Sequence, residues 1–442
     1  MNKKKWFPLF VLLLLTFTTI VSACSNHSTQ SESDNSSNAG TEQSSPSSSP
    51  TDSPAKELVK LNFSTNASGG TLDAYQVIVD QFNKDNPEIN VEMSALGKDF
   101  NTLMTAKMAN NDLPDLFSTA GWSVRRFGEY LLPLNDRSWA MQVNEQIKPT
   151  VTDGNGNLVV LPLDIDISGV VYNPEILKQL NLKAPETWDQ FLTACETIKK
   201  AGYTPISVAG KDSGDIAGLM SRLSLSLLVQ SNPSYKDDFD KDSFDWTHFA
   251  SVTDFVSNLK KKGYLNVDVL TADKPTVYAE LAKGKVAFAF QSNQTIAEVK
   301  KLNPDALISM MPLPVSDANT QPFLISGERD SVGIWKESKH PKEALIFLDY
   351  LAKSENVQKV AESYSLQAGL KGVQTNLGAL QETFDQYSQA VVSNHFDRQY
   401  LPNGMFTTLG TVGSGLLSGT MDSKQVEATM KDDYDRLKKA GN

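Results

Sequence analysis

The chain has 442 residues, of which 40% are hydrophobic and 21% are charged, and its formal net charge is −11 at pH 7. This acidic balance argues against a nucleic-acid-binding protein and favours a soluble protein with an acidic surface. About 385 residues remain after a polar N-terminal segment. Because this exceeds the usual size of one hydrophobic core, we expect two lobes or domains.

The N-terminus has the pattern of an export signal. Lys3–Lys5 precede an apolar run, Phe7–Val21, and small residues lead to Cys24. We interpret residues 1–23 as a signal peptide, because the apolar run is too short for a comfortable membrane span. A cysteine directly after small residues resembles the lipobox of bacterial lipoproteins, which implies that Cys24 is lipidated. An ordinary secretory peptide and an uncleaved membrane anchor are the alternatives.

Residues 24–56 are predicted to be a lipid-anchored tether. Ser, Asn, Thr and Pro dominate this segment, which has too little to bury to offset its ordering entropy and should be disordered. Removing the signal peptide takes away three lysines and no acids, which changes the net charge to −14. We expect the mature protein on the outer face of a bacterial cytoplasmic membrane, in a Gram-positive setting, held by a two-chain anchor.

The first globular segment alternates between strand and helix patterns. Residues 59–63 have period-two hydrophobicity, residues 72–82 have helical spacing, and residues 89–93 alternate again. This order predicts a parallel α/β lobe. Ligands in such sheets bind beyond the carboxyl ends of the strands, so Asn66 is a candidate at the rim of a cleft.

Trp122 is a candidate for stacking on a ligand. Pro114-Asp115 introduce a short buried strand, and Gly121-Trp122 follow where that strand meets its loop. A pyranose presents an apolar C–H face, and tryptophan offers a broad flat surface for it. A core or lid tryptophan is the alternative interpretation.

Asp164 and Asp166 lie two residues apart, on one face of a regular strand. Three uses of the pair remain open. Paired carboxylates can perform acid/base chemistry, they can accept hydrogen bonds from the hydroxyl groups of a neutral sugar, or they can belong to a structural hinge.

The next residues carry clear helix signals. After a β-branched run that ends at Tyr172, Asn173-Pro174-Glu175 read as a helix start. Thr187 and Gln190 have the spacing of a capping box at the start of a second helix. Cys195 falls on the apolar stripe of that helix and is interpreted as a small core residue.

Polar residues follow two later predicted strands. The strand at residues 286–290 is followed by Gln291 and Asn293, and a glycine-bearing turn contains Glu328 and Arg329. Arg329 can bind a ligand or form an ion pair with a neighbouring acid. Further helices are predicted at residues 216–230, 248–262 and 341–353, whereas the region after Tyr364 has no sharp site.

Several motifs, in the same order, resemble one family. They are Pro162, Tyr172-Asn173, Pro185 and Thr187-Trp188-Asp189, together with the runs ANNDLPDLF, GKVAFAF, MMPLP and PKEALIFLDYLAK. They resemble the bacterial extracellular solute-binding protein family 1, the sugar-binding lipoproteins of ABC transporters that are related to maltose-binding protein. Many members place a tryptophan where Gln291 to Gln294 stand here, which argues against assuming a maltodextrin-like ligand.

The resemblance implies an α/β fold of the two-lobed periplasmic-binding-protein type, class II, with discontinuous lobes joined by hinge strands. We expect chain crossings near residues 161–166, 323–330 and 352–364. The expected lobe boundaries are 57–163 and 326–355 for the N-lobe, and 164–325 and 356–442 for the C-lobe.

The resemblance also implies a function. We expect a monomeric receptor that binds a carbohydrate, an oligosaccharide, between its lobes and delivers it to ABC permease subunits. The expected ligand-binding residues are Asn66, Trp122, Asp164, Asp166, Gln291, Asn293, Glu328 and Arg329. A secreted carbohydrate-active enzyme, a glycosidase or lyase, is the alternative, and a sensory or adhesion lipoprotein is a third. Peptides, polyamines and glycerophosphodiesters are alternative ligands.

No catalytic residue, metal or cofactor is predicted. The four histidines, His27, His248, His340 and His395, lack metal-ligand spacing with one another or with a cysteine. The sequence contains neither a phosphate-binding glycine loop nor a nucleophile elbow. A glycosidase needs only two carboxylates, so this absence is weak evidence alone, and it is the family resemblance that implies a binding protein rather than an enzyme.

Overall fold

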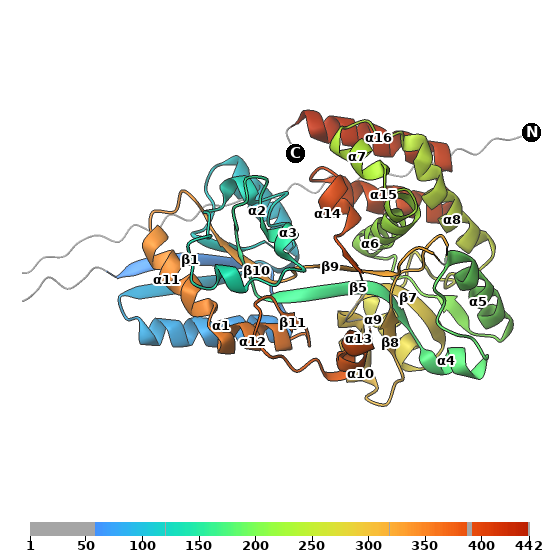
Figure 1. Cartoon of the computed structure of the whole chain (residues 1–442), viewed down its shortest axis with the longest axis horizontal. Helices are drawn as coiled ribbons and strands as arrows, with labels where there is room; N and C mark the ends of the chain where they lie inside the picture. The colour runs from blue at the N-terminus through green and yellow to red at the C-terminus, as the bar shows by residue number, and fades with distance from the viewer. Residues whose placement is uncertain (1–57, 120, 318, 387–390, 441–442) are drawn as a thin grey trace, which may run out of the picture. The chain divides into compact units, whose positions relative to one another are not determined.

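The computed structural model describes residues 58–119, 121–317, 319–386 and 391–440. The predicted signal peptide, Cys24 and the tether up to residue 56 lie outside the described residues. The described chain forms two β-sheets with helices packed around them, which confirms the predicted α/β class (Figure 1). None of its helices combines the length and apolar character needed to cross a membrane.

The first sheet has five strands in the order β2-β1-β3-β10-β4. Their bounds are β1 Val59–Thr65, β2 Ile89–Ala95, β3 Leu116–Ser118, β4 Leu161–Pro162 and β10 Ser331–Ile334. Strand β1 is parallel to β2 and β3, whereas β10 is antiparallel to β3 and β4. The strand–helix–strand start therefore forms the parallel unit that the sequence predicts.

Five helices share a hydrophobic core with this sheet. They are α1 Gly69–Asp85, α2 Phe100–Ala109, α3 Lys148–Val151, α11 Pro341–Leu351 and α12 Ser354–Glu362. Phe63 of β1, Phe82 of α1 and Phe347 of α11 meet in this core, where the ring centroids of Phe82 and Phe347 lie 4.9 Å apart, edge to face. Residues distant in sequence thus build one lobe, because a strand and two helices bury their aromatic faces together.

The second sheet has the strand order β12-β9-β5-β7-β6, and β8 and β11 also pair with β5. The bounds are β5 Asp164–Tyr172, β6 Thr204–Ile206, β7 Val286–Ser292, β8 Ser309–Met311, β9 Phe323–Gly327, β11 Gln367–Ala368 and β12 Val391–Ser393. Side chains from β9 enter two core clusters, with Phe323 and Ile325 in one and Leu324 in the other. Apolar packing on both faces explains why β5 is a nearly continuous apolar run after its two acids.

Eleven helices of the described chain pack against the second sheet. On one side they are α4 Pro174–Gln179, α5 Trp188–Lys200, α6 Ser213–Ser224, α7 Tyr235–Asp240, α8 Ala250–Lys261, α14 Phe396–Tyr400, α15 Met405–Ser418 and α16 Ser423–Lys439. The others are α9 Lys274–Ala282, α10 Gln294–Leu302 and α13 Gln381–Gln386. Short turns are η1 Gly97–Asp99, η2 Gly128–Tyr130, η3 Ala140–Gln142, η5 Trp246–Phe249 and η6 Gly378–Leu380, and η4 Leu225–Gln230 continues α6 as a π-helix.

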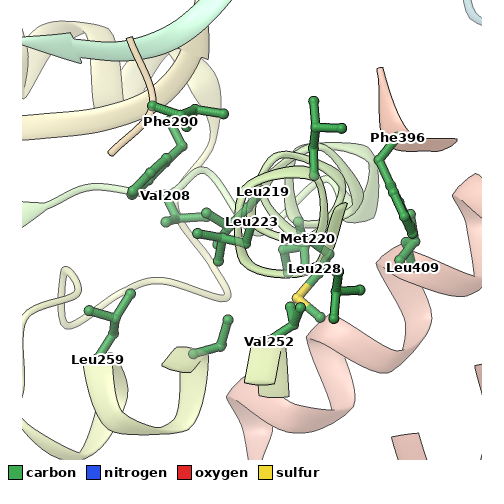
Figure 2. Close-up of a cluster of buried hydrophobic side chains, with 14 of the residues drawn as sticks. Val208, Leu219, Met220, Leu223, Leu228, Val252, Leu259, Phe290, Phe396 and Leu409 are labelled. Atoms are coloured by element: carbon green, nitrogen blue, oxygen red, sulfur yellow. The ribbon is translucent and has the colours of Figure 1, made fainter. Parts of the chain in front are cut away.

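Helix α6 lies at the centre of the larger core. Figure 2 shows its Leu219, Met220 and Leu223 surrounded by apolar side chains from other elements, among them Leu409 of α15. Helix α15 approaches closely because it has a glycine at the contact: a Cβ on Gly410 would lie 2.6 Å from the carbonyl oxygen of Ser213. A helix that is apolar around most of its surface is stable only when buried in this way.

The predicted helix starts are confirmed at α4 and α5. The side chain of Asn173 accepts hydrogen bonds from the backbone N–H groups of Glu175 and Ile176. Thr187 and Gln190 form the reciprocal capping box. Cys195, on the buried face of α5, lies in the core, as predicted.

Two strands carry the chain from one sheet to the other. The chain leaves the first sheet after β4 and enters the second as β5, and it returns from β9 to β10 through residues 328–330 (Figure 1). Strands β5 and β9 pair in antiparallel fashion, with Asp166 opposite Gly327. The two crossings expected at residues 161–166 and 323–330 are therefore present.

The third passage lies later than the expected range of 352–364. Val357 and Val360 of α12 are buried in the core of the first sheet, and so is Leu370. Leu377 is the next residue buried with the second sheet. Val373 still packs against the core of the first sheet, and we therefore propose a lobe boundary between residues 373 and 377 in place of 356.

Candidate functional site

Two adjoining cavities lie where the chain passes between the sheets. The Trp122 cavity has a volume of about 190 Å³, and its lining includes Trp122, Thr150 and His395. The Asp166 cavity has a volume of about 230 Å³ and is lined by Asn66, Ala67, Asp166, Arg329, Asp330, Tyr364 and Arg398. Arg398 also lines the Trp122 cavity. Each cavity is thus lined by segments that pack with different sheets.

Asn66 reaches the Asp166 cavity from the carboxyl end of β1. Thr65, the last residue of that strand, fixes the loop: its Oγ1 accepts hydrogen bonds from the Ala67 N–H at 3.0 Å and from the Ser118 hydroxyl at 2.8 Å. The Oδ1 atom of Asn66 is buried and has no hydrogen-bond partner among the described residues. Asn66 therefore lies at the strand end where the sequence predicts it, and its side chain offers an acceptor to the cavity, while its role in ligand binding stays a prediction.

Asp164 and Asp166 differ in environment although they share one strand. Oδ1 of Asp164 accepts the backbone N–H groups of Arg329 and Asp330, both at 2.9 Å. Asp166 lines the cavity, where its buried Oδ1 has no partner within the described chain. Burial raises the pKa of both carboxyl groups. Asp164 therefore has the contacts of a hinge residue, and Asp166 those of a cavity wall.

Arg329 is held by three neighbours in the cavity wall. Its guanidinium lies 3.9 Å from the ring centroid of Tyr364, and Nη1 donates to Oε1 of Gln294 at 2.7 Å. Nε lies 3.5 Å from Oδ2 of Asp330. The ion pair with a neighbouring acid is present, and the same side chain lines the cavity.

Trp122 contacts arginines from two segments. The guanidinium of Arg126 lies 4.5 Å from its ring centroid, and that of Arg398 lies 5.8 Å away. Arg126 also donates to Oδ1 of Asn403 at 3.1 Å, and burial lowers its pKa to about 10. One part of the indole surface thus has a protein partner, while the side chain also lines the cavity.

Glu328 is buried beneath the cavities in a chain of hydroxyl groups. Its Oε1 accepts from Ser123 at 2.8 Å, and Ser123 Oγ lies 2.7 Å from Thr119 Oγ1. Burial raises the pKa of Glu328. Its carboxyl group is absent from the lining of both cavities described above.

Gln291 and Asn293 lie at the end of β7 and the start of α10. Gln291 pairs with Gly169 of β5, and Asn293 donates its backbone N–H to Ile167 at 2.9 Å. Both amide atoms of the Asn293 side chain are buried without a partner among the described residues. Neither residue lines the two cavities. Of the predicted site residues, Asn66, Trp122, Asp166 and Arg329 therefore line the two cavities. Gln291 and Asn293 lie beside β5 and outside both linings.

Sequence reasoning missed the contribution of the segment after β12. His395 and Arg398 line the Trp122 cavity, and burial together with Arg398 and Arg222 lowers the pKa of His395 well below its usual value. Tyr364 lines the Asp166 cavity. The available signal was weak: a short polar run, Ser393 to His395, precedes a one-turn helix. Within the described residues, no group of three or more His, Cys, Asp or Glu side chains is arranged to hold a metal ion.

Comparison with known proteins gives consistent results. The family model described as "Bacterial extracellular solute-binding protein" matches residues 68–358. The melibiose/raffinose/stachyose-binding protein MelE of Bacillus subtilis is 30% identical over 389 residues, which cover 87% of this chain and 91% of that protein. A sugar transporter protein of Bacillus licheniformis, solved in complex with stachyose, has a TM-score of 0.78 and 32% identity, and the match covers 86% of this chain and 100% of that one. A B. subtilis binding protein solved in an open conformation has a TM-score of 0.81 and 29% identity, covering 88% and 99%.

Proposed function

The chain belongs to the bacterial extracellular solute-binding protein family, and we propose that its ligand is a carbohydrate, an oligosaccharide, held in the two cavities and passed to the permease subunits of an ABC importer. The similar proteins with sugar names and the stachyose complex support this ligand class. Family membership also favours a receptor over the glycosidase or lyase considered from the sequence.

The observation that carries the proposal is the chemistry of the Asp166 cavity. Asn66 and Asp166 each have a buried acceptor atom without a partner in the described chain, while Arg329 and Arg398 supply donors. A sugar hydroxyl donates one hydrogen bond and accepts others, so it can satisfy both kinds of group at once. Buried polar groups are costly unless they are paired, which favours a ligand rich in hydroxyls.

The charges of the cavity favour a neutral ligand. The lining contains two carboxyl groups, of Asp166 and Asp330, and two guanidinium groups, of Arg329 and Arg398, so acids and bases are equal in number. A polyamine or a phosphodiester would add an unpaired charge to this enclosed site, which is unfavourable. Trp122, in the adjoining cavity, supplies an apolar surface suited to the C–H face of a pyranose.

The proposed mechanism is closure of two lobes on the ligand. Asn66 and Trp122 come from segments that pack with the first sheet, whereas His395 and Arg398 follow β12 of the second. A ligand that contacts both groups favours the conformation in which they are close. Asp164 secures the turn at Arg329 and Asp330, through which the chain returns between the sheets.

A thermal-shift screen with melibiose, raffinose and stachyose tests the ligand class. A sugar at 100 times its Kd stabilises the folded state by about 2.7 kcal/mol, which raises Tm by mass action. Isothermal titration of the active sugar then gives its affinity, and chromatography of the recovered sugar shows whether it is returned intact. Unchanged Tm with all oligosaccharides, combined with a shift for a peptide or polyamine, would contradict the proposal. Cleavage of the sugar would support the enzyme instead.

We also propose that the mature protein is anchored through Cys24 to the outer face of the cytoplasmic membrane of a Gram-positive cell, as a monomer. The lipobox-like sequence and the family's extracellular location support this placement. Fractionation of cells that express the wild type and Cys24→Ser provides the test. We expect the wild type in the membrane fraction and the variant outside it, and equal distribution of the two would count against lipidation.

A further inference from the structure

Arg398 occupies a position shared by the two cavities. It lies on α14, beyond residues 68–358 that the family model matches, and it lines both the Trp122 cavity and the Asp166 cavity. Its Nη1 donates to the carbonyl oxygen of Glu328 at 3.4 Å, and its Cζ lies 5.8 Å from the Trp122 ring centroid. The guanidinium therefore adjoins both the polar and the aromatic parts of the site.

Gly121 makes room for this guanidinium, and Gly327 lies at ordinary contact distance from it. A Cβ on Gly121 would lie 2.2 Å from Nη1 and 2.5 Å from Cζ of Arg398, and a Cβ on Gly327 would lie 3.4 Å from Nη1. Gly121 also has a φ of +79°, which side-chain-bearing residues rarely adopt. The backbone at Gly121 is thus shaped so that the guanidinium packs directly against it.

The charges around Arg398 leave it suited to an uncharged ligand. Asp166 and Glu328 provide negative charge, and the proximity of Arg398 opposes the effect of burial on the pKa of each. Arg126 and Arg222 add positive charge near Arg398. His395 does not, because burial together with Arg398 and Arg222 lowers its pKa well below the usual value and favours the neutral ring. A planar guanidinium carries five N–H donors in a fixed fork, so it can donate to more than one oxygen at a time.

The volumes of the cavities set the size of ligand. At about 190 Å³ and about 230 Å³, each cavity is smaller than the ~300–1,000 Å³ typical of small-molecule pockets, whereas the two together fall within that range. A ligand that fills both must pass Arg398, because this side chain lines each of them.

We infer that Arg398 is a specificity-determining residue that donates to oxygens of two adjoining sugar units, one in each cavity, so that the receptor selects oligosaccharides over monosaccharides. This inference rests on the proposed carbohydrate function. The polar Asp166 cavity holds one ring through its hydroxyls, and the Trp122 cavity holds the next against the indole. Arg398 bonds to oxygens near the linkage that joins them.

Isothermal titration of the wild type, Arg398→Gln and Arg398→Lys tests this role. The probes are melibiose, raffinose and stachyose, together with their constituent monosaccharides galactose, glucose and fructose. For the wild type we expect the oligosaccharide that binds to exceed its monosaccharides in affinity by at least about 100-fold. Arg398→Gln should lower oligosaccharide affinity roughly 10- to 100-fold and monosaccharide affinity far less, so the ratio falls. Arg398→Lys, which keeps the charge but not the fork, should lose an intermediate amount.

Two further variants separate ligand contact from lobe closure. Gln146 donates to the Ser326 hydroxyl of β9 at 3.1 Å, and neither residue lines the two cavities, so Gln146→Ala should weaken both classes of sugar by the same factor. Arg436, an exposed residue of α16, pairs with Asp433, and Arg436→Gln should leave both affinities unchanged. Tm of each variant without ligand shows whether it is folded.

The outcomes distinguish the inference from the function on which it rests. If the wild type binds no sugar in the panel, the carbohydrate proposal itself fails. If it binds sugars, but monosaccharides bind as tightly as oligosaccharides, the inference alone is overturned. An equal loss for both classes in Arg398→Gln would overturn it as well, since that result describes a residue that only aids closure.

Discussion

Asp164 and Asp330 place two buried carboxyl groups next to each other at the point where the chain returns from the second sheet to the first. Asp164 accepts the backbone N–H of Asp330, and burial and mutual repulsion raise the pKa of Asp164. Burial also raises the pKa of Asp330. The hinge therefore contains a carboxyl pair that is more stable with a proton than with two negative charges.

The first prediction concerns the acceptor role of Asp164. Asp164→Ala leaves the N–H groups of Arg329 and Asp330 without their acceptor, and we expect the free energy of unfolding to fall by about 2–4 kcal/mol. Asp164→Asn keeps an oxygen in place and removes the repulsion, so it should cost less than about 1 kcal/mol. Urea denaturation measures both. An equal loss in the two variants would mean that charge, rather than hydrogen bonding, gives this residue its role.

The second prediction is a pH dependence of stability. Folding raises the pKa of the Asp164 carboxyl group, so the native state binds more protons than the unfolded state. The contribution of this proton to the free energy of unfolding is complete below the unfolded pKa of about 3.9, and it is lost as pH rises through the folded pKa. As pH increases above about 4, the free energy of unfolding of Asp164→Asn should therefore increase relative to that of the wild type. The maximum slope for one proton is about 1.4 kcal/mol per pH unit. Parallel pH curves for the two proteins would show that the pair titrates normally.

The third prediction separates binding from stability at Asp166. Burial raises the pKa of Asp166 even though Arg329, Arg398 and Arg222 oppose this shift. The charged form is therefore destabilising, and Asp166→Asn should leave the free energy of unfolding unchanged or raise it. The same change removes a charged acceptor from the cavity and should lower sugar affinity roughly 10- to 100-fold. Titration calorimetry and denaturation of the same preparation provide the two readouts, and unchanged affinity would place Asp166 outside the ligand contacts.

The fourth prediction tests Trp122 as a stacking surface. Trp122→Ala should lower oligosaccharide affinity about 10- to 100-fold, because the C–H face of the ring loses its aromatic partner. Trp122→Phe retains part of the surface and should lose less. Since Arg126 and Phe406 also contact the indole, Tm must be measured with affinity. A fall in Tm with no change in affinity would make Trp122 a structural contact between segments.

Local signals made much of the fold predictable. Asn173 and Thr187 mark helix starts because their side chains bond to backbone groups only two or three residues away, so the sequence contains the whole interaction. The acids of β5 show the limit of this approach. Asp164 lies opposite Ala368 of β11 and Asp166 lies opposite Gly327 of β9, and these partners, distant in sequence, give two residues of one strand different environments.

Arg398 was unpredictable for the same reason. Its place in the site depends on Gly121, which is distant from α14 in the sequence. The position of Asn66 in a cavity could be predicted because the carboxyl end of a parallel strand is a general location for ligand sites. Gln291 and Asn293 lie at the end of β7, which is antiparallel to β5, and neither side chain lines the two cavities.

The last prediction couples Gly121 to Arg398. Gly121→Ala adds a methyl group where the guanidinium lies and strains a backbone with positive φ, so it should displace Arg398 and reduce oligosaccharide affinity as Arg398→Gln does. If both changes act through one contact, the double variant should bind the oligosaccharide no more weakly than whichever single variant has the lower affinity. Gly156→Ala is a matched control, because Gly156 also has a positive φ but nothing lies within 4 Å of its Cβ position. It should lower Tm modestly and leave affinity unchanged. Additive losses in the Gly121 and Arg398 cycle would show that the two residues act independently on the ligand.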